Sequence, residues 1–126
     1  MTNHVHWVAS VADGFNLVDI VRDFKKHTSK TIIKELQSNF QESRKEWMLA
    51  IFHNAGQYNS NNKDFQFWRQ DNRPIELFSN EVIDQKIDYI HQNPVLAGFV
   101  NEAEHWKWSS AIDYAGGKGL IEIELL

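Results

Sequence analysis

Inward-facing positions recur at three- and four-residue spacing over residues 17–37, which is the pattern of an amphipathic helix. These positions are Leu17, Ile20, Val21, Phe24, Thr28, Ile32 and Leu36. Asn16 precedes them and suits an N-cap, and Asp19 places a negative charge in the first turn, where it favours the helix dipole. We therefore predict a helix over 17–37 with an apolar inner face and a basic outer face.

Three other segments carry helical periodicity or helix-terminating residues. Residues 42–54, around Trp47 and Ile51, predict a second helix. Ser79 suits the N-cap of a helix over 80–92, and Pro94 predicts the end of that helix because proline pushes the preceding residue out of the helical region. The pair Ser109-Ser110 predicts the start of a short helix that ends at Gly116-Gly117.

Four segments read as strands. Residues 3–11 alternate loosely and contain Val and Trp, which are typical of strands. Short runs at 65–68 and 75–78 predict two more strands, which would form a hairpin-like insertion over 56–78. Residues 121–125 alternate as an edge strand would.

Length and composition limit the class of protein. The chain has 126 residues, 42% of them hydrophobic, and no cysteine. This suits a single soluble domain over 1–126 with a modest core, and excludes a disordered chain. No apolar run reaches the length of a membrane span, so no membrane partner is expected. The lack of cysteine excludes disulfides and thiolate metal sites, and it fits a reducing, cytoplasmic setting.

Charge is unevenly distributed along the chain. The net charge of −4 argues against a protein that coats nucleic acid indiscriminately. Residues 22–34, however, hold five Lys or Arg against a single Asp. Such a local basic face is compatible with binding a particular nucleic-acid structure. A solvated helix face is the ordinary alternative, and the pattern alone leaves both open.

The first candidate chemistry is the pair His4 and His6. In a strand the two imidazoles would share one face while Val5 turns into the core, and two neutral imidazoles form half of a metal site. The ordinary alternative is a pair of half-exposed strand residues.

The second candidate chemistry lies at the end of the predicted 80–92 helix. Tyr89 and Asn93 are four residues apart and so share one side of it. A phenol nucleophile beside a divalent ion, held by His4, His6 and the Asn93 carbonyl, would make a phosphoryl-transfer site. A boundary tyrosine and a helix-ending Asn-Pro are the ordinary alternatives. His91 faces away from Tyr89 and takes no catalytic role in this interpretation.

Two motifs resemble those of a known family. NHVHW at 3–7 resembles the His-hydrophobic-His motif of the HUH endonuclease superfamily. DYIHQNPVLAGFV at 88–100 resembles the tyrosine-helix signature of its single-tyrosine transposases, especially the REP-associated tyrosine transposase-like proteins of bacteria. WKWSS at 106–110 with YAG at 114–116, and the stretches RDFKKHTSK and FWRQDNRPIELFSNE, also resemble segments of that family. The resemblance covers nearly the whole chain, with both motifs in the family's order.

The resemblance implies a fold and an activity. The fold would be α+β, a ferredoxin-like HUH nuclease core with an antiparallel sheet packed with helices, here lacking its N-terminal strand-helix-strand portion. The activity would be cleavage of single-stranded DNA beside a hairpin, with Tyr89 as the nucleophile that forms a 5′-phosphotyrosine and leaves a 3′-hydroxyl. His4, His6 and Asn93 would be the metal ligands, for Mg²⁺ or Mn²⁺. A homodimer is left open, since an exposed sheet edge would favour one.

The resemblance also gives the basic residues a role in binding DNA. The helix residues would meet phosphates without reading bases, and the arginines near Trp68 would contact the hairpin or an unpaired base. The residues concerned are Arg22, Lys25, Lys26 and Lys30 on the helix, and Arg69 and Arg73 in the loop.

Two other functions remain as alternatives. One is a DNA-hairpin-binding remnant that has lost catalysis. The other is a small metal-dependent hydrolase built on the His-x-His strand, which predicts further His, Asp or Glu ligands on neighbouring strands. The remaining histidines, at positions 27, 53, 91 and 105, fall mainly on helices or loops, so we rank the hydrolase last.

Overall fold

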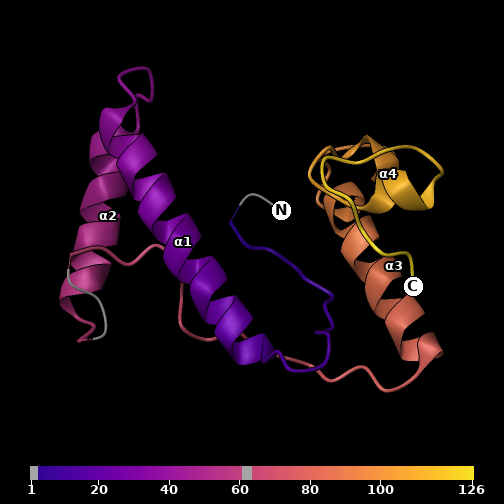
Figure 1. Cartoon of the computed structure of the whole chain (residues 1–126). Helices are drawn as coiled ribbons and strands as arrows, with labels where there is room; N and C mark the ends of the chain where they lie inside the picture. Colours follow the sequence, from indigo (N-terminus) through magenta and orange to yellow (C-terminus); the bar gives the residue numbers. More distant parts are fainter. Residues whose placement is uncertain (1–2, 61–63) are drawn as a thin grey trace. The chain divides into compact units, whose positions relative to one another are not determined.

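The computed structural model describes residues 3–60 and 64–126, and within them it contains four α-helices and one 3-10 helix. In chain order these are α1 (Leu17–Ser38), α2 (Lys45–Gln57), α3 (Asn80–Leu96), the 3-10 helix η1 (Ala103–His105) and α4 (Ala111–Tyr114) (Figure 1). The chain divides into two compact units. The helical-hairpin unit is Ser10–Arg73, and the C-terminal unit combines Met1–Ala9 with Pro74–Leu126.

The prediction of an α+β, ferredoxin-like fold is wrong, because the described residues contain no β-strand and their regular structure is entirely helical. The ranges 3–11, 65–68, 75–78 and 121–125 are irregular, so neither the sheet nor the hairpin forms. Residues 61–63 of the expected insertion lie outside the described residues. A segment forms a β-strand only when its backbone N–H and C=O groups are hydrogen-bonded to a second extended segment. Alternation of apolar and polar side chains does not show that such a segment is present. The Gln66 N–H bonds instead to the carbonyl of Phe52 in α2, at 2.8 Å.

In the helical-hairpin unit, α1 confirms the predicted first helix. The Asn16 side chain accepts the Val18 N–H at 2.9 Å, and the apolar stripe buries Ile33 and Leu36. Helix α2 lies antiparallel beside α1 (Figure 1). The short link between the helices makes this arrangement the natural one.

The segment after α2 returns across the two helices and is held by aromatic contacts. Phe67 packs on Phe52 of α2 with ring centroids 5.2 Å apart, and Trp68 packs on Phe24 of α1 at 6.0 Å. The indole N–H of Trp68 donates to Thr28 Oγ1 at 2.8 Å. The aromatic run that suggested a strand therefore covers the helix pair.

In the C-terminal unit, α3 starts where predicted but ends later. The Ser79 hydroxyl accepts the Val82 N–H, as expected of an N-cap, yet the helix passes through Pro94 to Leu96. Proline removes one helical hydrogen bond, and packing compensates because the Pro94 ring is fully buried. Beyond it, Phe99 N–H bonds to the Pro94 carbonyl and Gly98 N–H to the Val95 carbonyl, both at 2.9 Å. This is a Schellman motif, and Gly98 supplies its left-handed residue at φ +73°.

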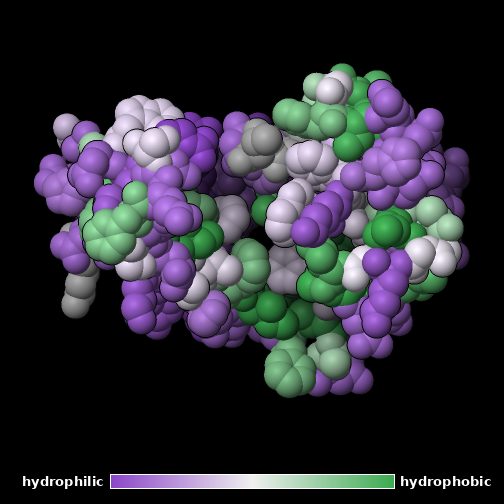
Figure 2. All heavy atoms as spheres, turned by 90° about the horizontal axis from the view of Figure 1, so that it is seen from above, coloured by the Kyte–Doolittle hydropathy of each residue, from purple (hydrophilic) through white to green (hydrophobic). Residues whose placement is uncertain are grey.

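The core of this unit lies along one side of α3. Ile87, His91 and Pro94 form its buried stripe, and Ala111 at the start of α4 is also buried. Phe99 stacks on Trp106 with ring centroids 5.5 Å apart. Many other apolar side chains reach the surface, as the space-filling view shows (Figure 2). Among the described residues, well-buried apolar side chains are therefore few.

Candidate functional site

Four residues that the sequence singles out come together in the C-terminal unit. Asn93 Nδ2 lies 3.4 Å from Nε2 of His6, and the His6 ring meets Tyr89 edge to face with centroids 5.7 Å apart. The His4 ring contacts His6 in the same way, at 4.9 Å. The histidines lie in an irregular segment and the other two residues in α3. The cluster therefore forms although no strand presents the histidines.

Helix α3 sets the relation between Tyr89 and Asn93. Residues four apart in a helix lie above one another, so the phenol and the amide face the same side. Tyr89 is 54% exposed, so its ring is accessible from solvent. Within residues 3–60 and 64–126 no hydrogen bond occupies its hydroxyl. The oxygen is therefore free to act on a bound group.

The surroundings of His6 favour its neutral form. Burial, and then the neighbouring His4 ring, lower the pKa of His6 below its ordinary value of 6.5. The Asn93 amide donates to His6 Nε2, which requires that nitrogen to be unprotonated. His4 Nδ1 lies 2.7 Å from Asn3 Oδ1, so its Nδ1–H is the donor and its Nε2 faces no hydrogen-bond partner among the described residues. An imidazole oriented through one nitrogen in this way is prepared to bind a cation through the other.

Two imidazoles and one amide oxygen are the side-chain groups here that could hold a divalent cation. The part of the chain that the structure describes has no group of three or more His, Cys, Asp or Glu side chains placed to hold a metal. A cation bound here would have to take its third ligand from Asn93, whose amide would turn from its present hydrogen bond to His6 so that Oδ1 replaces Nδ2. Mixed nitrogen and oxygen ligands suit Mn²⁺ better than Mg²⁺, which prefers oxygen throughout. With only three protein ligands, such a cation would keep coordination positions for water and phosphate oxygens.

The predicted DNA-binding residues all lie in the helical-hairpin unit, and three of them are already engaged. Lys25 Nζ donates to the Arg69 carbonyl at 2.6 Å and to the Asn72 side chain, so it ties the returning segment to α1. Arg22 is paired with Asp19 and Asp23, and Arg73 with Asp71 at 2.8 Å. Lys25 thus does not belong to the solvated face, and the charges of the two arginines are partly neutralised.

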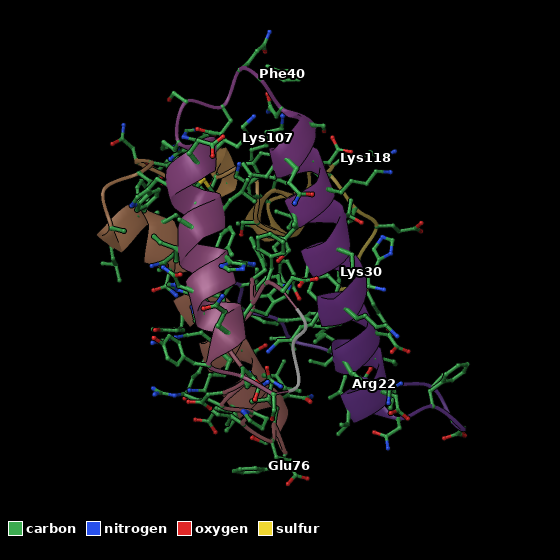
Figure 3. The ribbon with its side chains drawn as sticks, turned by 90° about the vertical axis from the view of Figure 1, so that its left-hand side faces the viewer. Arg22, Lys30, Phe40, Glu76, Lys107 and Lys118 are labelled. Carbon is green, nitrogen blue, oxygen red and sulfur yellow. The ribbon has the colours of Figure 1, made fainter. Side chains whose placement is uncertain are left out.

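The remaining basic residues are better placed to bind phosphates. Lys26, Lys30 and Arg69 are exposed, and no ion pair formed within the described ranges includes them. Figure 3 shows Lys30 near the middle of α1 and Arg22 near its start. The basic face predicted for α1 is therefore reduced mainly to the two lysines.

The sequence interpretation gave His91 no catalytic role and did not predict that it is buried. This side chain is only 8% exposed, and its Nε2 lies 2.9 Å from Ser110 Oγ. Its ring also contacts Tyr114 of α4 edge to face, with centroids 5.1 Å apart. Burial lowers the pKa of His91, against the opposing charge of Asp88. The signal available in the sequence was a polar residue between Ile87 and Pro94 at helical core spacing.

Comparison with protein-family models, with curated proteins and with solved structures finds no match to this chain. The resemblance of its two motifs to the HUH superfamily therefore stays a prediction. None of the helices within the described residues combines the length and apolar character that a bilayer span requires.

Proposed function

We propose that the chain is a metal-dependent, tyrosine-nucleophile endonuclease and strand transferase that acts on single-stranded DNA beside hairpins, in the bacterial cytoplasm. The observation that carries the proposal is the cluster of Tyr89 and Asn93 with the histidine pair. An exposed phenol beside two imidazoles and an amide is a set suited to phosphoryl transfer. The substrate class comes from the resemblance of the two motifs.

The reaction exchanges one phosphoester bond for another. The Tyr89 oxygen attacks phosphorus and loses its proton, and the bond from phosphorus to the 3′ oxygen breaks. The leaving oxygen takes up a proton and becomes a free 3′-hydroxyl, while the phosphate stays on Tyr89 as a 5′-phosphotyrosine. Attack by a different 3′-hydroxyl reverses the step and transfers the strand. A divalent cation held by His4, His6 and Asn93 would supply Lewis-acid polarisation of the phosphate.

The helical-hairpin unit would contribute affinity for the DNA backbone. Lys26, Lys30 and Arg69 keep charges that no described ion pair offsets, so they are the best candidates for phosphate contacts. Such contacts hold nucleic acid without reading its sequence. Recognition of a hairpin would then depend on its shape.

The test is the formation of a covalent adduct. The full chain is incubated with Mn²⁺ and a hairpin-containing single-stranded DNA labelled on its 3′ side, and adducts are resolved on a denaturing gel. We expect an adduct with the wild type and none with Tyr89→Phe. The matched control is Tyr58→Phe, which alters a 93% exposed tyrosine of the other unit and should leave the adduct unchanged. An adduct that survives Tyr89→Phe would disprove the nucleophile assignment.

A hairpin-binding protein without catalysis is the second candidate. It is favoured by the weakness of the donor set, which has an amide in place of a third imidazole or carboxylate. Retained hairpin binding with no adduct in the wild type would support it. The small metal-dependent hydrolase gains nothing from the structure, because it needs a third strong ligand that the described residues do not place near the pair.

A further inference from the structure

His91 occupies the middle of the buried stripe of α3. Its neighbours in the stripe are Ile87 and Pro94, and an apolar side chain would continue the pattern. A buried polar group costs free energy unless it is hydrogen-bonded, and the His91 ring has one such partner within residues 3–60 and 64–126, Ser110 Oγ at 2.9 Å. Ser110 immediately precedes α4, whose Tyr114 packs on the same ring. The histidine thus links α3 to the C-terminal segment.

The position of His91 couples this link to the candidate site. It follows Tyr89 by two residues and precedes Asn93 by two. Two residues turn a helix by about 200°, so the phenol and the amide face the side opposite to the imidazole. Any rotation of α3 that moves His91 off Ser110 therefore moves Tyr89 and Asn93 relative to His6.

The hydrogen bond restrains this rotation more narrowly than apolar packing does. An N···O contact weakens steeply when its distance or angle changes, whereas apolar contacts are non-directional. Beyond the end of α3, the stacking of Phe99 on Trp106 provides a second attachment. The helix is thus held at its last turns and again just after them.

We propose that His91 is a positioning residue, whose hydrogen bond to Ser110 sets the rotation of α3 so that Tyr89 and Asn93 face His6. The inference deepens the proposed function and, as far as catalysis is concerned, rests on it. It gives a role to a side chain that touches neither DNA nor a cation.

The test compares four variants of the full chain. His91→Leu completes the apolar stripe, and Ser110→Ala removes only the hydroxyl. Ser109→Ala is the matched control, because the Ser109 hydroxyl accepts the Ala111 N–H at 3.2 Å, whereas His91 is hydrogen-bonded to the neighbouring Ser110. His91→Gln keeps a side-chain donor at the same position and tests rescue.

The first measurement needs no catalysis. The Tyr89 ring lies 5.7 Å from that of His6, so it contributes a ring-current shift to the His6 Hε1 proton at fixed pH. We expect this resonance to move in His91→Leu and Ser110→Ala, and to stay in place in Ser109→Ala and His91→Gln. The second measurement is the single-turnover rate of adduct formation, which should fall about tenfold or more in the first two variants with DNA affinity unchanged.

Each result supports or overturns either the positioning role of His91 or the proposed function. An unchanged His6 resonance in folded His91→Leu and Ser110→Ala overturns the positioning role, and so does an equal effect of Ser109→Ala. If His91→Leu fails to fold, Ser110→Ala decides alone. If the wild type forms no adduct, the proposed function fails while the resonance still tests the role of His91.

Discussion

The side-chain amide of Asn93 lies 3.4 Å from Nε2 of His6, and 87 positions separate the two residues in the chain. The contact brings the last turn of α3 to the irregular segment that carries both histidines. Because Tyr89 lies one turn before Asn93, the same contact brings a phenol to the imidazole pair. Two polar segments distant in the sequence thus form one site within the C-terminal unit.

His6→Ala should weaken Mn²⁺ binding by about tenfold or more, because it removes one of only two imidazoles in the donor set. Asn93→Asp should strengthen binding, since a carboxylate is a better ligand for a hard cation than an amide. A titration with Mn²⁺, monitored by electron paramagnetic resonance, measures the affinity of each variant. The control is His27→Ala, which removes an exposed histidine of α1. Equal affinity in His6→Ala and His27→Ala would rule out this metal site.

Stability should fall in mild acid. The pKa values of His6 and His91 are both lowered, so the folded state holds these groups neutral while the unfolded chain protonates them near 6.5. The unfolded state then binds more protons below that pH, and the free energy of unfolding decreases as pH falls from about 6.5 toward the lowered values. Above about pH 7 the two histidines are neutral in both the folded and the unfolded state, so their effect on the free energy of unfolding no longer changes with pH.

Urea unfolding of the C-terminal unit at several pH values measures this slope. His91→Gln, which has no titrating group, should make the slope shallower, whereas His27→Gln should leave it unchanged. A slope that His91→Gln does not alter would mean that His91 is not held neutral by folding.

Trp68→Phe should destabilise the helical-hairpin unit by about 1 kcal/mol, because it removes the hydrogen bond to Thr28 and leaves most of the ring packing. Thr28→Val removes the same bond from the other side. The double variant should lose less unfolding free energy than the sum of the losses in the two single variants. Urea unfolding measures the free energy for all three variants. Strict additivity would show that the indole N–H does not hold the returning segment on α1.

The salt dependence of DNA binding distinguishes free from paired basic residues. Lys26→Ala and Lys30→Ala should each lower affinity and reduce the slope of log K against log salt by about 0.7, the value per phosphate contact on single strands. Arg22→Ala should have a smaller effect, because Asp19 and Asp23 already offset its charge. Fluorescence anisotropy over a range of salt concentrations measures the slopes. A larger change for Arg22→Ala than for the lysines would contradict this order.

The sequence by itself determined where α1 and α3 begin. Asn16 and Ser79 cap α1 and α3 as predicted, because capping and helical periodicity involve residues within one or two turns of each other. The same local geometry placed Tyr89 and Asn93 on one side of α3. The end of α3 was misjudged, since burial of the Pro94 ring outweighed the local preference of proline.

Only the tertiary structure decided which alternating segments pair and which polar side chains are engaged. Strand pairing requires a partner distant in sequence, so the alternation in 3–11 and 65–68 could not show that none would form in the described residues. Likewise, Lys25 donates to the Arg69 carbonyl and His91 is hydrogen-bonded to Ser110. Both bonds join elements that lie far apart in the sequence, so the spacing of residues could not predict them. Local periodicity determines which residues share a face of a helix, and long-range packing determines which other elements that face contacts.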